Sequence, residues 1–275
     1  MKTRIVVAVV GIALLLAVIF AGPVWLLGAV VGVIAFCSTW EMLTSACKGL
    51  NIRLYIYAGI AAFVIPFASS LADPMKVTVL TAFLLFALCF AEMMLSFQTE
   101  RRWTLGEIST VVLAGAVMPT MLASLVRLGL RSEGAACVFL PFLICWVCDS
   151  GAYFGGGLFG KHALAPEISP KKTIEGSICG FVLGIAAAVI YGVVLRAAGY
   201  TVPLLVIGVY GFLGSLACQM GDLCFSCIKR LAGVKDYGTL LPGHGGMLDR
   251  FDSMFWTAVT VEILMNLVPA ITAAV

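Results

Sequence analysis

Charged side chains are scarce in this sequence. Lysine, arginine, aspartate and glutamate account for 11% of its 275 residues, whereas they make up about 25% of a typical soluble domain. Hydrophobic residues account for 62%, which is more apolar surface than a water-soluble fold of this size could bury. The net charge of +3 is too small to indicate nucleic-acid binding. The composition therefore excludes an ordinary soluble protein and predicts an integral membrane protein.

Long apolar stretches fill most of the chain. Nine of them could cross about 30 Å of hydrocarbon as helices, and Gly22-Pro23 forms a tight turn between the first two. We predict an all-α, polytopic membrane protein of about nine transmembrane helices, with residues 1–275 as a single integral membrane domain. The predicted spans are Ile5–Ala21, Val24–Leu43, Leu54–Ser70, Val77–Phe97, Ile108–Val126, Ala135–Gly157, Ile174–Leu195, Pro203–Cys224 and Ser253–Ala273.

The basic residues are distributed unevenly among the loops. Cytoplasmic loops of membrane proteins carry an excess of lysine and arginine. If the N-terminus is cytoplasmic, the outer loops hold only a few of the 17 basic residues, namely Lys76, Arg127, Arg131 and Arg196. We therefore expect a cytoplasmic N-terminus. The first apolar stretch has no clear cleavage site, so we interpret it as an uncleaved helix rather than a secretory signal.

Ten cysteines are present, and two pairs have the CxxC spacing: Cys145 with Cys148, and Cys224 with Cys227. A structural zinc site or a disulfide is one interpretation. Both pairs lie in or at the end of predicted membrane helices, however, and no histidine flanks them. Cysteine packs well as a small hydrophobic residue, so the spacing favours packing.

The sequence from Ser226 to Asp252 is a charged island between two apolar spans. Basic groups suit phosphates, and closely spaced carboxylates suit a divalent metal ion. If the eighth span continues as a helix beyond the bilayer, Asp222 and Ser226 share a face with Lys229 and Arg230. The two cations could instead only extend to lipid headgroups. An aspartate at a membrane boundary is costly, however, and is often functional.

A glycine-rich turn lies inside the island, where Gly245 and Gly246 follow His244. Such a turn lets backbone N–H groups approach an anion such as phosphate. Asp249 and Asp252 come next, three residues apart, so they share a face of a starting helix. They could hold Mg²⁺ against the phosphates of a nucleotide. The alternative is that they only complement the helix N-terminus.

A second polar loop joins the sixth and seventh spans. Lys171 and Lys172 precede Thr173, which is a candidate N-cap of the following helix. Cations beside a helix N-terminus form an anion site, although the positive-inside bias alone could place lysines there. Both this loop and the charged island are cytoplasmic in the predicted topology. We therefore expect that the two could meet.

Several carboxylates lie inside predicted spans. Asp149 in the sixth span requires a partner or a water-filled cavity, and the glycines that follow it permit close helix approach. Glu41 and Glu92 are near cytoplasmic ends and could simply extend to the membrane interface. Glu262 lies deeper, and the sequence assigns it no role.

These motifs resemble the signature of the phosphatidate cytidylyltransferases, also called CDP-diacylglycerol synthases. The charged island carries the main pattern, which is Ser226-x-Ile-Lys-Arg, then Lys235-Asp, then Pro242-x-His-Gly-Gly-Met-x-Asp-Arg-Phe-Asp252. Ser169-Pro-Lys-Lys-Thr-x-Glu-Gly176 and Asp149-x-x-Ala-Tyr-x-x-Gly156 resemble further motifs of the family. Residues 135–275 would form the catalytic half, because residues 1–134 carry no matching motif.

The resemblance implies that the protein transfers a cytidylyl group from CTP to phosphatidate, which gives CDP-diacylglycerol and pyrophosphate. It also implies Mg²⁺ beside a second, monovalent cation such as K⁺, and a homodimer. The distribution of lysine and arginine predicts an active site that faces the cytoplasm. The compact chain without extra domains indicates the plasma (inner) membrane of a bacterium. The implied catalytic residues are Lys171, Lys172, Lys229, Arg230, His244, Asp249 and Arg250. The implied nucleotide-binding residues are Ser226, Lys235, Asp236, Gly245 and Gly246. The implied metal ligands are Asp222, Asp249 and Asp252, and Asp149 and Tyr153 are candidates for a lipid or metal site.

Other functions fit part of the pattern. A transporter could use Asp149 and Glu262 along a substrate path, but the polar residues gather at one membrane face and inverted repeats are not evident. A CTP-dependent lipid kinase has similar needs, but it transfers the γ-phosphoryl group and releases CDP. The motif of the CDP-alcohol phosphotransferases is absent from the sequence.

Overall fold

The computed structural model describes residues 2–240 and 245–273. A helix lies at the position of every predicted span, which confirms an all-α architecture with a few short strands. The helices are α1 (Lys2–Ala21), α2 (Val24–Ala46), α3 (Ile52–Ser69), α4 (Pro74–Ser96), α5 (Leu105–Val112), the π-helical segment η1 (Leu113–Val117), α6 (Met118–Gly129), α7 (Gly134–Phe159), α8 (Ile174–Ala197), α9 (Leu204–Leu231) and α10 (Leu248–Leu267).

Seven helical segments within the described residues are long and apolar enough to cross a membrane. They are α2, α3, α4, the continuous segment Leu105–Gly129, α7, α8 and α9. Val9–Ala21 in α1 is a shorter apolar helix, and α10 is not among the seven. The protein is therefore a polytopic membrane protein, while the count of nine spans and the orientation of the N-terminus remain predictions.

The chain folds into two compact units. The N-terminal unit consists of Met1–Arg127 and Leu231–Phe251, and the C-terminal unit consists of Leu128–Arg230 and Asp252–Val275. Most of the charged island therefore belongs to the N-terminal unit. The first turn of α10 contributes to one unit and the rest of that helix to the other.

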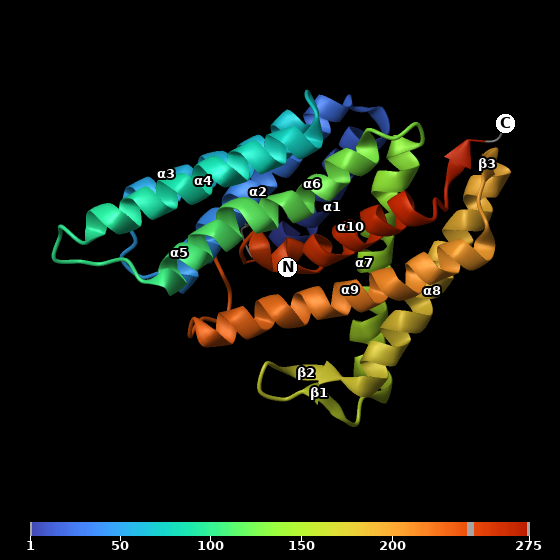
Figure 1. The fold of residues 1–275 in the computed structure, drawn as a ribbon. Helices are drawn as coiled ribbons and strands as arrows, with labels where there is room; N and C mark the ends of the chain where they lie inside the picture. Colours follow the sequence, from blue (N-terminus) through green and yellow to red (C-terminus); the bar gives the residue numbers. More distant parts are fainter. Residues whose placement is uncertain (1, 241–244, 274–275) are drawn as a thin grey trace. The chain divides into compact units, whose positions relative to one another are not determined.

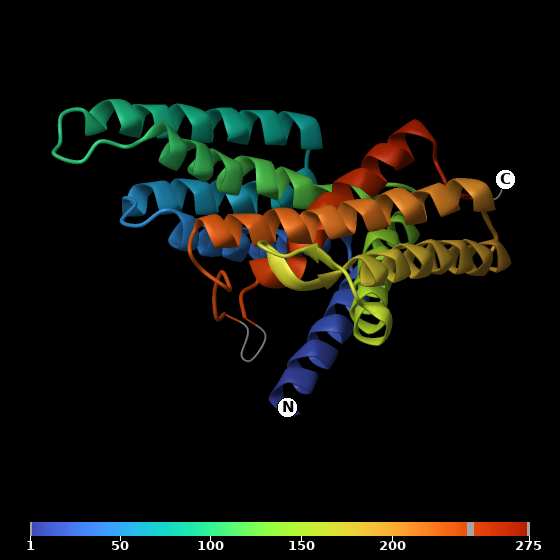
Figure 2. The same cartoon turned by 90° about the horizontal axis from the view of Figure 1, so that it is seen from below.

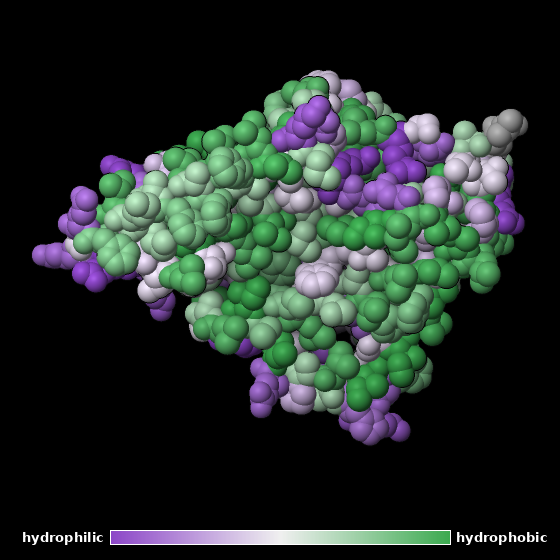
Figure 3. All heavy atoms as spheres, viewed as in Figure 1, coloured by the Kyte–Doolittle hydropathy of each residue, from purple (hydrophilic) through white to green (hydrophobic). Residues whose placement is uncertain are grey.

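In the N-terminal unit, α3 lies between α2 and α4 (Figure 1). Apolar side chains on α4 such as Val79 and Phe83 are exposed, as expected for a helix that faces hydrocarbon. Figure 3 shows mainly hydrophobic residues over α3 and α4, and hydrophilic residues at the loop that follows α4. This distribution fits helices that pass through a bilayer and end in polar loops.

The fifth span is interrupted by the π-helical segment η1. Thr39 of α2 is almost fully buried, and its hydroxyl donates to the carbonyl of Ala114 in η1 at 2.6 Å. A π-helical turn shifts backbone carbonyls out of the regular ladder. This bond fixes α2 against the fifth span.

In the C-terminal unit, α7 and α8 pack closely through glycines (Figures 1 and 2). A Cβ atom on Gly176 would lie 2.6 Å from the carbonyl oxygen of Ala152 and 2.9 Å from Cα of Gly156. Only glycine fits at such a backbone approach. Gly155 and Gly156, in the glycine run after Asp149, therefore serve the contact between these two helices, whereas Gly157 does not.

Two short antiparallel sheets complete the C-terminal unit. Strands β1 (Ala163–Ala165) and β2 (Ser169–Thr173) form a hairpin that leads into α8 (Figure 2). Strands β3 (Tyr200–Thr201) and β4 (Thr272–Ala273) pair near the end of the chain. The prediction of a helix through Ala273 was wrong at its end, because α10 stops at Leu267. Pro269 lacks an N–H and disfavours helical geometry in the residue before it.

Candidate functional site

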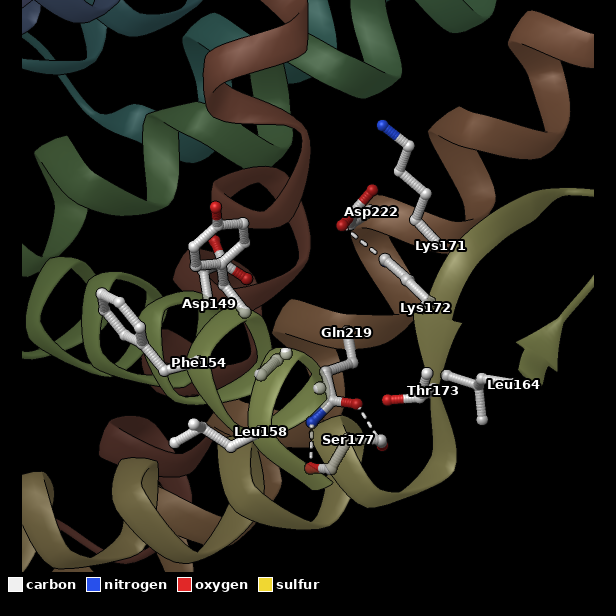
Figure 4. A pocket seen from close by; sticks show the side chains of 14 residues that line it. Asp149, Phe154, Leu158, Leu164, Lys171, Lys172, Thr173, Ser177, Gln219 and Asp222 are labelled. Carbon is white, nitrogen blue, oxygen red and sulfur yellow. Dashed lines mark hydrogen bonds and ion pairs between the residues drawn. The ribbon is translucent and has the colours of Figure 1, made fainter. Parts of the chain in front are cut away.

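The C-terminal unit contains a pocket of about 690 Å³ that is lined by both charged and apolar side chains. Figure 4 shows side chains from α7, the β1–β2 hairpin, α8 and α9 around it. Its charged lining consists of Asp149, Lys171, Lys172 and Asp222, and its apolar lining includes Tyr153, Phe154, Leu158 and Leu164. A pocket of this size accommodates a small-molecule ligand.

An ion pair joins two of the motifs in this pocket. Nζ of Lys172 in β2 lies 2.5 Å from Oδ2 of Asp222 in α9, and both side chains are half-buried (Figure 4). Arg230, further along α9, donates through Nε to the carbonyl of Ile168 in the hairpin at 3.0 Å. The expectation that the second polar loop meets the island is therefore confirmed for the part of the island that lies on α9.

The start of α8 has the predicted cap. The hydroxyl of Thr173 accepts a hydrogen bond from the amide of Gly176 at 3.1 Å. Glu175 in the same turn accepts from the backbone amides of Lys161 and His162 and pairs with the imidazole of His162. These contacts fix the ends of the β1–β2 hairpin and so hold Lys171 and Lys172 at the pocket.

Two polar residues inside the spans were not singled out from the sequence. Gln219 of α9 donates through its side chain to the carbonyl of Ser177 in α8 at 3.1 Å, and the Ser177 hydroxyl bonds back to Gln219 (Figure 4). Both line the pocket, together with Asp149, which accepts from the thiol of Cys218. A glutamine within an apolar stretch was the signal that could have identified this pair.

The helix α9 continues to Leu231, as the one-face prediction requires. The hydroxyl of Ser226 donates to Asp222 Oδ1 at 3.2 Å, and both Ser226 and Lys229 are buried. The face therefore carries an acid, a hydroxyl and a buried cation, with Arg230 exposed at its end.

Asp252 is buried in the C-terminal unit at the start of α10. Its Oδ1 accepts from the amide of Ser253 at 2.8 Å. The backbone of α10 comes so close here that a Cβ atom on Gly221 would lie 2.9 Å from the carbonyl oxygen of Asp252. Burial, and then the carboxylate of Asp222, raise the pKa of Asp252 well above its ordinary value.

Asp249 lies in the N-terminal unit, where it holds two pieces of loop. Its Oδ2 accepts from the amide of Tyr237 at 2.9 Å and from the amide of Gly246 at 3.2 Å. Gly245 has φ of +87°, a backbone conformation that favours glycine. The Gly246 amide, predicted to face a phosphate, therefore donates to Asp249 in this structure.

Glu41 has contacts in the N-terminal unit that the sequence did not predict. It is 6% exposed. Its Oε1 accepts from the amide of Met247 at 2.9 Å, and its Oε2 accepts from the amide of Leu248 at 2.8 Å. A carboxylate of α2 thus caps the N-terminus of α10.

The remaining predicted residues are exposed or outside the described part. Lys171, Tyr153, Lys235, Asp236 and Arg250 are exposed. His244 lies outside the described residues, as do the three residues before it.

Comparison with known proteins identifies the family of this chain. The sequence profile described as the Cytidylyltransferase family matches residues 2–268, almost the entire chain. The chain belongs to the cytidylyltransferase family. Its membership covers the N-terminal helices as well as the motif-bearing half.

Individual relatives are similar over a shorter stretch. A protein named phosphatidate cytidylyltransferase from Staphylococcus saprophyticus is 41% identical over 135 residues, which are 49% of this chain and 51% of the relative. The protein of the same name from Staphylococcus aureus (strain COL) is 46% identical over 137 residues, with the same coverage. The cytidylyltransferase chain thus spans about half the length of the curated relatives it matches.

Carboxylates are the side chains here that could hold a divalent cation. Within residues 2–240 and 245–273, no three His, Cys, Asp or Glu side chains are grouped so that they could hold a metal ion. Mg²⁺ is usually held by only one or two carboxylates, with water and substrate phosphates as the other ligands. Asp222 and Asp252 supply hard oxygen donors, and the carboxylate of Asp222 opposes ionisation of Asp252. This donor set fits a divalent cation whose remaining ligands come from water and substrate phosphates.

Proposed function

We propose that this chain is a phosphatidate cytidylyltransferase, which transfers the cytidylyl group of CTP to phosphatidate and forms CDP-diacylglycerol and pyrophosphate. Family membership and the names of the similar proteins support the proposal. The observation that carries it is that charged and apolar side chains line one pocket in the C-terminal unit. There Lys171 and Lys172 line the same space as Phe154 and Leu158. Phosphatidate likewise combines an anionic head with apolar chains.

The reaction needs no side-chain nucleophile, because the phosphate of phosphatidate is already an anion near neutral pH. One of its oxygens bonds to the α-phosphorus of CTP, and the bond between that phosphorus and the bridging oxygen of the β-phosphate breaks. Pyrophosphate leaves with the electron pair. The task of the protein is therefore to position the two substrates and to offset their negative charge.

Lys172 is the cation best placed for the lipid phosphate. It is held by Asp222, so its ammonium group is oriented before the substrate arrives. Arg230 fixes the hairpin that carries it through the carbonyl of Ile168. We assign the offsetting of phosphate charge to Lys171, Lys172, Lys229, Arg230 and Arg250, and the donation of hydrogen bonds to the nucleotide phosphates to Ser226, Lys235, His244 and Gly245. The Gly246 amide is left out because it donates to Asp249.

We propose Mg²⁺ as the cofactor. Asp222 and Asp252 would hold it in the C-terminal unit, and the sequence motif names Asp249 as a further ligand. When bound, Mg²⁺ supplies charge neutralisation and orientation of the triphosphate. Asp236 is proposed to contact the nucleotide, and a second, monovalent cation is proposed from the family resemblance alone.

The location and assembly are part of the same proposal. A cytoplasmic active site in the bacterial plasma membrane would give the pocket access to CTP and to lipid at once. The distribution of lysine and arginine among the loops supports this orientation. A homodimer is proposed from the family resemblance.

The proposal is tested with purified protein in detergent, CTP and Mg²⁺, supplied with either phosphatidate or diacylglycerol. Formation of CDP-diacylglycerol from phosphatidate, with no reaction of diacylglycerol, supports it. Phosphorylation of diacylglycerol would instead indicate a lipid kinase, and the proposal would be wrong.

A further inference from the structure

Glu41 has no role in the proposed chemistry, yet it is one of the few buried carboxylates in the N-terminal unit. It is 6% exposed, and both of its oxygens are occupied by backbone amides, those of Met247 and Leu248. Leu248 is the first residue of α10 and is fully buried. Because these amides lie at the N-terminus of α10, the carboxylate also lies at the favourable end of the helix dipole.

The loop is shaped around this carboxylate. A Cβ atom on Gly238 would lie 2.5 Å from Oε1 of Glu41, and a Cβ atom on Gly246 would lie 2.5 Å from Oε2. Because Gly238 and Gly246 have no side chains, they leave the space that the Glu41 carboxylate occupies. The sequence alone suggested that glycine here lets a ligand approach, but the group that approaches Gly246 is Glu41.

The helix that carries Glu41 is itself fixed. One turn further along α2, the hydroxyl of Ser45 donates to the carbonyl of Tyr237 at 3.0 Å. Residues four apart lie on one helix face, so Glu41 and Ser45 hold the loop at two points. Thr39 secures α2 to Ala114 of the π-helical segment.

Asp249 depends on the same two pieces of loop. Its Oδ2 accepts from the amides of Tyr237 and Gly246. Ser45 holds the carbonyl of Tyr237, and Glu41 holds the residues that directly follow Gly246. The position of the Asp249 carboxylate is therefore set from α2.

We propose that Glu41 is a positioning residue for Asp249, the carboxylate that the family motif assigns to the metal ion. By holding the amides of Met247 and Leu248, it keeps in place the loop that binds the Asp249 carboxylate through the amide of Gly246. The inference rests on the proposed function, and it gives the N-terminal helices a part in catalysis. Residues that orient a metal ligand typically change metal affinity or activity by about 10–100-fold when replaced.

Three variants of the full-length protein in detergent test this proposal. Glu41→Gln keeps the size of the side chain but turns an NH₂ donor toward one of the two amides. Glu41→Asp keeps the charge and should fall between wild type and Glu41→Gln. The matched control is Glu92→Gln, because Glu92 is 7% exposed in the same unit and contacts Arg53 and Tyr57 instead.

Two of the readouts do not require turnover. Hydrogen–deuterium exchange in peptides covering residues 245–252 should become about 10-fold faster in Glu41→Gln, because a charge-assisted hydrogen bond is lost. Binding of Mn²⁺, followed by electron paramagnetic resonance as a probe of the Mg²⁺ site, should weaken by about 10-fold. Glu92→Gln should change neither quantity.

The activity readout separates positioning from general damage. In Glu41→Gln, the Mg²⁺ concentration for half-maximal turnover should rise by about 10-fold, with little change in KM for phosphatidate. Faster exchange with unchanged Mn²⁺ binding and Mg²⁺ dependence would overturn the proposal, since Glu41 would then only stabilise the fold. If the wild-type protein shows no cytidylyl transfer, the proposed function fails, while exchange and Mn²⁺ binding still decide the role of Glu41.

If the Glu41 variants do not fold, a substitution in the loop tests the same contact. Gly238→Ala places its Cβ against Oε1 of Glu41 and disturbs the same contact from the loop side. It should weaken Mn²⁺ binding in the same direction. Unchanged Mn²⁺ binding in Gly238→Ala, with Glu41 intact, would also contradict the proposal.

Discussion

Lys172 and Asp222 form an ion pair in which Nζ and Oδ2 are 2.5 Å apart, and both side chains line the pocket of the C-terminal unit. One comes from the strand β2 and the other from α9, 50 positions later in the sequence. Since both are half-buried, the pair is partly shielded from water and holds the lysine in a fixed direction. An anionic headgroup that enters the pocket would meet an oriented ammonium group.

Replacement of Lys172 by methionine should reduce cytidylyl transfer by at least about 100-fold, because an oriented charge at the reacting phosphate is lost. Lys161→Met is the matched control, since Lys161 lies just before the hairpin, is exposed and does not line the pocket. Initial rates over a range of phosphatidate concentrations measure the effect. Equal rates for the two variants would show that Lys172 has no role at the reacting phosphate.

Asp249→Asn should abolish turnover and leave the protein folded. The side-chain oxygen of asparagine can still accept from the amides of Tyr237 and Gly246, so the loop should persist. The negative charge offered to a cation is lost, and we expect a reduction of about 100-fold or more. Thermal unfolding in detergent and size-exclusion chromatography check the fold. Near-normal activity in a folded variant would contradict the assignment of Asp249 to the metal.

The sequence predicted the helices well because membrane spans follow from apolar length alone. The cap at Thr173 was also predictable, since the Thr-x-x-Gly contact with Gly176 is local. The continuation of α9 to Leu231 was anticipated from the spacing of Asp222 and Ser226. The end of the last helix was missed because hydrophobicity was followed past Pro269.

The roles of residues in the N-terminal unit could not be derived in the same way. Glu41 contacts Met247 and Leu248, more than 200 positions away. No local pattern marks that contact, and a carboxylate near the end of a span usually extends to water. The pairing of Lys172 with Asp222 was anticipated only as a meeting of two loops, since sequence gives the chemistry of the partners and not their distance.

Gly176→Ala should destabilise the C-terminal unit. The added Cβ would lie 2.6 Å from the carbonyl oxygen of Ala152, which belongs to the backbone of α7 and cannot move aside. We expect a loss of roughly 2 kcal/mol in the free energy of unfolding. Gly157→Ala is the control, because its Cβ would meet nothing within 4 Å. Denaturant titrations should show no comparable loss for Gly157→Ala, and equal losses would contradict the close approach of α7 and α8.

Asp252→Asn should stabilise the protein at alkaline pH. Burial raises the pKa of Asp252, so the folded state binds a proton more tightly than the unfolded state. The free energy of unfolding therefore falls as pH rises through the folded pKa. In EDTA, Asp252→Asn should raise the Tm by roughly 5 °C at pH 8 and by less at pH 5.

The exposed Asp236 supplies the control for this pH effect. Asp236→Asn should shift the Tm by the same small amount at both pH values. If Asp252→Asn behaves like Asp236→Asn, the carboxyl of Asp252 does not carry the burial cost that its surroundings indicate.

The most direct measurement uses CTP labelled separately at the α- and γ-phosphates, with purified protein, phosphatidate and Mg²⁺. Transfer of the α-label into the lipid, with the γ-label released as pyrophosphate, is the predicted result. Entry of the γ-label into the lipid would show a kinase and contradict cytidylyl transfer. Absence of any transfer, while a known cytidylyltransferase works in the same assay, would contradict it as well.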